Sequence, residues 1–138
     1  HGDAKIVAEL PAAFDPSKIL FVGLRNWERG EIKARQHQYG IKHLTPEEVA
    51  ADSDALRAWL KSCGASKVVV HFDMDVLDPA EIVAAVGTDP DGMKIEAVIR
   101  VINDIAAEKE LVGLTVAEPM PRTAIRLRDM LGRLPLLE

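Results

Sequence analysis

The sequence predicts an α/β fold, a three-layer αβα arrangement in which helices cover both faces of a mainly parallel sheet. Four short runs of β-branched or other apolar residues alternate with longer segments of helical periodicity. The expected strands lie at residues 19–24, 41–44, 67–72 and 111–117. Strands that alternate with helices connect through crossovers, which run the strands parallel and place the helices on the sheet faces.

The first half of the chain contains two of these strands. Residues 19–24, ILFVGL, form an unbroken apolar run, which is typical of a strand buried on both faces. A polar helix is expected at residues 28–38, and Gly40 ends it. After the strand at 41–44, residues 45–48, TPEE, have the pattern of a helix start, with a capping Thr and a Glu three residues on.

The helix expected after this start has an apolar stripe with i, i+3, i+4, i+7 spacing, which predicts one buried face. The stripe consists of Leu56, Trp59, Leu60 and Cys63. Gly64 is expected to end the helix.

The second half of the chain repeats the alternation. A loop rich in Asp, Pro and Gly at residues 76–92 follows the strand at 67–72. Amphipathic helices are expected around residues 95–105 and 127–134, on either side of the last strand. The chain has no internal repeat and no linker-like segment, so a single domain is expected over residues 1–138.

The composition excludes several function classes. The chain has 138 residues, 48% of them hydrophobic, and a net charge of −5 with scattered basic residues, which argues against a nucleic-acid surface. No apolar run approaches the roughly 20 residues that span a bilayer. Cys63 is the single cysteine, so no disulfide framework exists and a reducing, cytoplasmic location is expected.

Two acidic residues follow the third expected strand. Asp73 and Asp75 stand at i and i+2, so in an extended strand they face the same way and converge on one point. Two converging carboxylates repel each other unless a cation lies between them, and Mn²⁺ prefers such oxygen ligands. The alternative interpretation is an acidic pair that is solvated or caps the next loop.

The residues around this pair resemble a known metal-binding motif. Residues 72–79, FDMDVLDP, are similar to the F-D-x-D-x-L-D-P motif of the ureohydrolase (arginase, agmatinase, formiminoglutamase) family. The resemblance implies that Asp73 bridges two Mn²⁺ ions and that Asp75 binds one of them. The related deacetylases have a His at the position of Asp75 and use one zinc, so Asp75 favours the ureohydrolase branch.

A third acidic residue follows the last expected strand. Residues 113–121, GLTVAEPMP, resemble the family's strand that leads to E-x-N-P, whose Glu holds the substrate guanidinium. The resemblance implies this role for Glu118, and a carboxylate suits a planar cation because it accepts two parallel hydrogen bonds. Met120 stands where the family usually has Asn. Alternatively, Glu118 complements the dipole of the helix that follows.

Two further segments resemble substrate-binding parts of the family. Residues 22–31, VGLRNWERGE, are similar to G-x-R-D-x-D/E-x-x-E, which implies a substrate contact for Glu28. The alternative is a solvated helix start with acidic residues near its N-terminus. Residues 87–92, GTDPDG, resemble the G-T-P-x-P-G-G loop beside the metals, which implies a substrate contact for Thr88.

Two earlier motifs of the family are not complete in this chain. They are a Gly-Gly-Asp-His segment and an Asp-Ala-His-x-Asp segment, which supply the His ligands and the other carboxylates. His1 and Asp3 resemble the tail of the second motif, but we expect them to end a helix instead, because only residues 4–18 separate them from the first strand. The chain is therefore expected to be the incomplete, C-terminal part of the arginase fold.

The resemblance implies a parent enzyme that hydrolyses a guanidino-type C–N bond to urea and an amine. Two Mn²⁺ ions about 3.5–4 Å apart would lower the pKa of a bridging water and supply hydroxide near neutral pH. Asp73 and Glu118 are the expected catalytic residues, and Asp73 and Asp75 the expected metal ligands. This chain by itself is expected to be inactive, because it lacks most of the ligands and its own residues hold Mn²⁺ weakly.

Two other function classes compete with this one. The first is a non-catalytic domain that uses an exposed sheet edge for assembly or binding. The second is a receiver-like signalling domain, which requires a Lys at the end of a late strand where this chain has Glu118. The expected partners are a small guanidino-type substrate and further copies of the chain, with no nucleic acid and no membrane.

Overall fold

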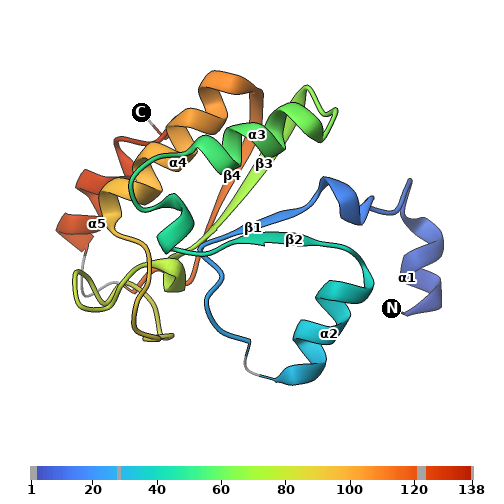
Figure 1. The fold of residues 1–138 in the computed structure, drawn as a ribbon, viewed down its shortest axis with the longest axis horizontal. Helices are drawn as coiled ribbons and strands as arrows, with labels where there is room; N and C mark the ends of the chain where they lie inside the picture. Colours follow the sequence, from blue (N-terminus) through green and yellow to red (C-terminus); the bar gives the residue numbers. More distant parts are fainter. Residues whose placement is uncertain (1–2, 28, 121–123, 138) are drawn as a thin grey trace.

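The computed structural model describes residues 3–27, 29–120 and 124–137. Within this part of the chain, helices and strands alternate as the sequence predicts (Figure 1). The helices are α1 (Ala4–Glu9), α2 (Gly30–Gln38), α3 (Asp54–Ser62), α4 (Ile95–Glu108) and α5 (Ala124–Leu131). The strands are β1 (Leu20–Val22), β2 (Lys42–Leu44), β3 (Lys67–Asp73) and β4 (Glu110–Ala117). Short 3-10 turns are η1 (Pro16–Lys18), η2 (Glu47–Val49) and η3 (Met74–Val76).

All described strand pairs are parallel, as the alternation of strands and helices predicts. The strands pair as β1 with β2 and as β3 with β4, in two separate ladders. In the longer ladder Lys67 lies opposite Glu110 and Asp73 opposite Ala117, with one irregularity between Val68 and Val69. Because β3 and β4 run parallel, their carboxyl ends meet at the same edge, and this edge carries the acidic residues.

The helices lie on both sides of the strands, which confirms the αβα layering. Figure 1 shows α3, α4 and α5 on one side and α1 and α2 on the other. The buried core consists largely of apolar side chains from α3, α4 and the segment that follows β3. The opposite face of the β3–β4 ladder is open: Val69 is 65% exposed and Val112 is 50% exposed.

The helix expected after Thr45 is interrupted. The capping box forms, since Thr45 N donates to Glu48 Oε2 at 2.7 Å and Glu48 N donates to Thr45 Oγ1 at 3.4 Å. It begins the single turn η2, however, and α3 begins only at Asp54. Arg100 of α4 occupies the break, where its Nη2 donates to the Val49 and Ala50 carbonyls, the latter at 3.1 Å. A side chain from a distant helix thus satisfies carbonyls that a continuous helix would have used.

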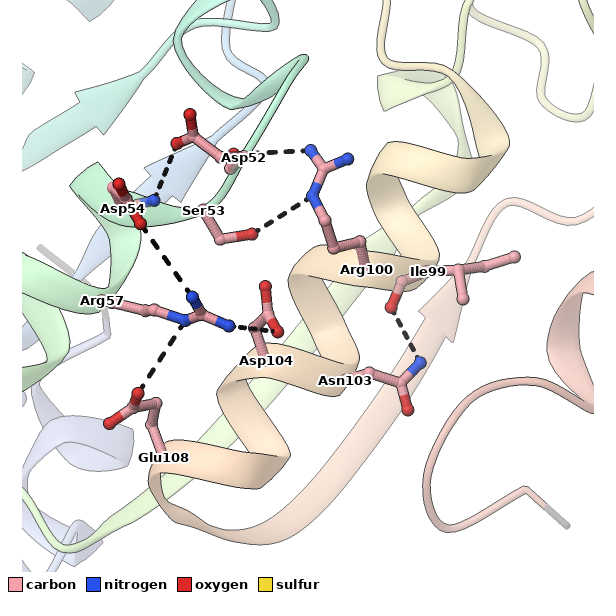
Figure 2. A network of polar contacts seen from close by, with 9 residues as sticks. All are labelled: Asp52, Ser53, Asp54, Arg57, Ile99, Arg100, Asn103, Asp104 and Glu108. Atoms are coloured by element: carbon pink, nitrogen blue, oxygen red, sulfur yellow. Dashed lines mark hydrogen bonds and ion pairs between the residues drawn. The ribbon is translucent and has the colours of Figure 1, made fainter.

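Charged side chains join α3 to α4, as Figure 2 shows. Arg57 Nη2 donates to Asp104 Oδ1 at 2.8 Å, and Arg57 Nε lies 3.8 Å from Glu108 Oε1. Asp54 Oδ1 lies 4.0 Å from Arg57 Nη1. We call these four residues the α3–α4 ion-pair network. In it one guanidinium faces three carboxylates, so the acidic charge on this surface has a basic partner.

No helix in the described ranges is long and apolar enough to cross a membrane. One contiguous apolar cluster runs from Val49 through α4 to Leu134, near the end of the chain. The expected single domain over residues 1–138 stays a prediction.

Candidate metal centre

The first acidic pair lies where β3 ends. Asp73 is the last residue of the strand, and Asp75 lies in the 3-10 turn η3. The expectation that both residues belong to an extended strand is therefore wrong for Asp75. Met74, between them, is 1% exposed and fixes the turn to the core. A tight turn anchored by a buried side chain, not strand periodicity, sets the direction of the second carboxylate.

Glu118 follows the last residue of β4, the strand that pairs with β3. Its φ of 55° lies in the left-handed region, which a non-glycine residue rarely adopts and which is common at functional sites. Next to it, Met120 N donates to the Ala84 carbonyl at 2.7 Å, so this strand end is attached to the loop after β3.

The three carboxylates converge. One oxygen each from Asp73, Asp75 and Glu118 lies within 4.8 Å of the other two. We call these three residues the carboxylate cluster. The Asp75 and Glu118 side chains are exposed and Asp73 is partly buried, so the cluster faces solvent on one side.

The electrostatics of the carboxylate cluster favour a bound cation. Asp73 Oδ1 is buried and has no hydrogen-bond partner among the described residues. Partial desolvation and, next, the Asp73 charge raise the pKa of Asp75, while the Arg25 guanidinium acts in the opposite sense. A buried carboxylate oxygen without a donor and two mutually repelling carboxylates fit a hard divalent cation, for which oxygen ligands are preferred.

A close contact between the β1 end and the loop after β3 supports this arrangement. Gly23 has a φ of 82°, and a Cβ built on it would lie 2.3 Å from Val76 Cγ2 and 2.7 Å from Met93 Sδ. On the other side, a Cβ at Gly87 would lie 3.1 Å from Asp75 Cβ. Glycines therefore allow two separate segments to approach the turn that carries Asp75.

Arg25 joins these segments, a role that no sequence pattern predicted. Its guanidinium donates to carbonyls of η3 and of the loop after Gly87. Beside it, Asn26 Nδ2 donates to Asp89 Oδ2 at 3.2 Å. An Arg at the carboxyl end of a strand, within the G-x-R segment, was the available sequence signal.

The residues expected to contact substrate are only partly described. Thr88 is exposed and lies between Gly87, which contacts Asp75, and Asp89, which contacts Asn26. Glu28 lies outside the described residues. The structure thus brings the Thr88 loop to the carboxylate cluster, and the substrate contacts of both residues stay predictions.

Other candidate ligands have structural partners. Asp3 accepts a hydrogen bond from Lys5 N at 2.8 Å and caps α1, and His1 lies outside the described residues. His43 Nδ1 lies 3.2 Å from Gln36 Nε2, and its ring meets the Trp27 ring edge-on at 5.1 Å. Within the described ranges, the group of possible metal-holding residues is the carboxylate cluster.

Comparison with known proteins places this geometry in a family. Residues 4–129 match the model of the Arginase family. An arginase of Entamoeba histolytica is 26% identical over 125 residues, which cover 88% of this chain and 42% of that protein. An arginase of Eremothecium gossypii is 27% identical over 130 residues, which cover 86% of this chain and 31% of that protein. The chain therefore spans less than half the length of these two relatives.

A solved structure agrees on the fold. The crystal structure of Entamoeba histolytica arginase in complex with L-ornithine superimposes with a TM-score of 0.72 at 22% identity, over 88% of this chain and 42% of that chain. This similarity shows that the αβα arrangement is that of part of an arginase fold. The family model covers most of the sequence, and the chain belongs to the arginase family.

Proposed function

We propose that this chain supplies part of a manganese centre in a ureohydrolase that cleaves a guanidino-type C–N bond to urea and an amine. The observation that carries the proposal is the carboxylate cluster, with oxygens of Asp73, Asp75 and Glu118 within 4.8 Å of one another. The buried, unpartnered Asp73 Oδ1 adds to it, because such an atom is stabilised by a cation.

In this proposal Asp73 and Asp75 hold the metal. Asp73 is the more enclosed of the two and suits a shared, bridging position, whereas Asp75 approaches from the exposed turn η3. When bound, divalent manganese acts as a Lewis acid and makes a nucleophile available from water near neutral pH. The role of the protein is to keep these carboxylate oxygens together against their mutual repulsion.

Glu118 is proposed to orient the substrate. Its exposed carboxylate lies beside the two aspartates, so a guanidinium that accepts attack next to the metal would lie within its reach. A carboxylate accepts two parallel hydrogen bonds from a guanidinium, which fixes both the plane and the direction of the cation. Thr88 and Glu28 are proposed as further substrate contacts, on the loop beside Asp75 and on the segment after β1.

The chain alone is proposed to be inactive. Two aspartates, Asp73 and Asp75, give fewer donors than the octahedral oxygen-rich shell that manganese favours, and two ions require more still. The relatives are longer, since the chain spans 42% and 31% of their lengths. The remaining ligands are proposed to come from polypeptide outside these 138 residues.

Two measurements test the function. Calorimetric titration of Mn²⁺ into this chain is expected to give weak binding that Asp73→Asn abolishes and Asp104→Asn, in the α3–α4 ion-pair network, leaves unchanged. Urea release from arginine, agmatine and related guanidino acids, and formamide release from a formimino substrate, is expected from a polypeptide that extends this chain at its N-terminus. If neither protein binds Mn²⁺ and neither releases product, the proposal is wrong.

A second candidate is a non-catalytic domain that self-associates. The open face of the β3–β4 ladder favours it, because Val69 is 65% exposed and Val112 is 50% exposed. Sedimentation of the chain tests it: a concentration-dependent oligomer that Val69→Lys dissociates would support assembly. We propose homo-oligomers and a cytoplasmic location for the parent enzyme as well, and the same sedimentation experiment tests the first of these.

A further inference from the structure

The guanidinium of Arg25 contacts main-chain carbonyls on both segments next to the carboxylate cluster. Nη2 donates to the Asp75 carbonyl at 3.0 Å, and Nη1 lies at 3.5 Å from the Val76 carbonyl. On the other segment, Nε donates to the Pro90 carbonyl at 2.8 Å and Nη2 to the Asp89 carbonyl at 2.6 Å. One side chain therefore connects the turn η3 to the loop that follows Gly87.

The geometry of these contacts requires Arg. Its planar guanidinium has five N–H donors in a fixed arrangement, whereas the Lys ammonium is a point charge on a flexible stem. Arg25 contacts four carbonyls on the two segments, more acceptors than the three donors of a Lys ammonium can serve. Arg25 is partly buried, which strengthens hydrogen bonds from a charged donor to neutral carbonyls.

The hydrogen bond from Arg25 to the Asp75 carbonyl bears directly on the carboxylate cluster. Arg25 holds the main-chain oxygen of the same residue whose side chain belongs to the carboxylate cluster. Arg25 holds the Asp75 carbonyl on one side, and Gly87 lies close to the Asp75 Cβ on the other. Together these contacts fix the point from which the Asp75 carboxylate projects. Buried Met74 anchors η3 to the core, and Arg25 adds a second anchor, at Asp75 itself, that opposes the repulsion between the Asp75 and Asp73 carboxylates.

We propose that Arg25 is the positioning residue of the metal centre, holding Asp75 and the 87–90 loop so that the carboxylate cluster stays converged. The role in metal binding rests on the proposed function, whereas the role in fixing the loop stands on the contacts of Arg25 alone. Arg25 acts through main-chain atoms and touches neither the metal nor the substrate.

The same region contains a matched control. Lys94 Nζ forms an ion pair with Asp78 Oδ2 at 2.6 Å, just beyond η3, and is 60% exposed. It stabilises the end of the same loop without touching a carbonyl of Asp75. Replacement of Lys94 therefore removes a charged contact of the loop but leaves the hydrogen bond that holds the Asp75 main chain in place.

The test compares the unchanged chain with Arg25→Met, Arg25→Lys and Lys94→Met. Binding of Mn²⁺ is followed by the EPR signal of the free ion, folding by circular dichroism, and loop order by hydrogen–deuterium exchange of residues 74–92 without metal. We expect Arg25→Met to weaken Mn²⁺ binding by about 10- to 100-fold, as loss of an orienting partner of a ligand does. Compared with Arg25→Met, Arg25→Lys is expected to recover folding stability but less than half of the lost Mn²⁺ affinity on a logarithmic scale. Lys94→Met is expected to bind Mn²⁺ within about twofold of the unchanged chain.

The two measurements separate this inference from the proposed function. If Arg25→Met speeds exchange of residues 74–92 in a folded chain while the unchanged chain binds no Mn²⁺, the metal centre is wrong and the positioning role stands. If exchange and affinity are both unaffected, or if Lys94→Met loses as much affinity as Arg25→Met, the positioning role is wrong.

Discussion

On the surface shared by α3 and α4, Arg57 lies among three carboxylates and forms an ion pair with each of them (Figure 2). At the ends of β3 and β4, three carboxylates also come together, yet in the described part of the chain no ion pair joins them to a basic residue. Arg25 is close by, but its hydrogen bonds go to carbonyls. The carboxylates of the first region are paired with a basic residue, whereas those of the second have no such ion pair within the described ranges, as the proposed metal site requires.

This difference explains why the two regions should respond oppositely to the same kind of substitution. Removing Arg57 leaves the three carboxylates of the α3–α4 ion-pair network without their shared basic partner, which lowers stability. Removing one member of the carboxylate cluster relieves repulsion, so stability is retained while the capacity to hold a cation is lost. The following predictions test this contrast, from the largest effect to the smallest.

Gly23→Ala is expected to destabilise the fold by about 3–5 kcal/mol, since overpacking adds to left-handed strain. A Cβ at this position, where φ is 82°, would lie 2.3 Å from Val76 Cγ2. The control is Gly64→Ala at the end of α3, where φ is 71° and, chain neighbours aside, no described residue has a heavy atom within 4 Å of the added Cβ. Urea unfolding should give a loss of only about 1–2 kcal/mol there; equal losses at both sites would contradict close packing at the strand ends.

Asp75→Asn is expected to weaken Mn²⁺ binding by about 100-fold, or roughly 2.7 kcal/mol, because a ligand contributes at least as much as its orienting partners. The free energy of unfolding without metal should not fall, because the repulsion from Asp73 and the desolvation of the charged form are removed. Calorimetry and urea unfolding measure the two quantities. A metal-free variant that is clearly less stable than the unchanged chain would show that Asp75 makes a stabilising contact instead.

Arg57→Met is expected to lower the free energy of unfolding by about 1–2 kcal/mol, because Asp104 and Glu108 then lose their basic partner. The value is moderate because 41% of the Arg57 side chain is exposed. Mn²⁺ affinity, measured on the folded variant, should stay within about twofold. A parallel loss of affinity would indicate that the α3–α4 surface and the carboxylate cluster are coupled.

Glu96→Gln is expected to have the smallest effect, and one that depends on pH. Arg133 holds this carboxylate through hydrogen bonds of 2.7 and 2.5 Å, which lower the pKa of Glu96. Its contribution is therefore present at neutral pH and is lost as the pH falls from the ordinary value of 4.5 through the lowered pKa. Urea unfolding between pH 7 and pH 3 should show a small deficit in the variant that shrinks as the pH falls below 4.5; a deficit that does not shrink would be due to another cause.

Sequence patterns predicted most of the framework because the information is local. The strand expected at residues 67–72 differs by one residue from β3 (Lys67–Asp73), and the strand at 111–117 by one from β4 (Glu110–Ala117). Apolar runs between turn residues are sufficient for such assignments. The expected helix from Thr45 to Gly64 is interrupted because Arg100, about 50 residues away, competes for its carbonyls.

The convergence of the acidic side chains followed from a simple rule, since parallel neighbours place their carboxyl ends at one edge of the sheet. The local structure that directs Asp75 differs from the one expected: the 3-10 turn η3, not the alternation of side chains along a strand, turns its carboxylate toward the cluster. Their roles as ligands stay predictions. The G-x-R segment marked Arg25 but not its contacts, because its acceptors lie 50 to 65 positions further along the chain.

The sequence by itself determined which segments become strands and helices, which face of each helix is apolar, and which residue types stand at the strand ends. These properties depend on neighbours within a few positions. Only the tertiary structure decided that β3 and β4 pair in the register that brings Asp73 beside Glu118, and that Arg25 is directed to carbonyls rather than to carboxylates. Such contacts join residues far apart in the chain, and they form because the packed core fixes the distance between elements.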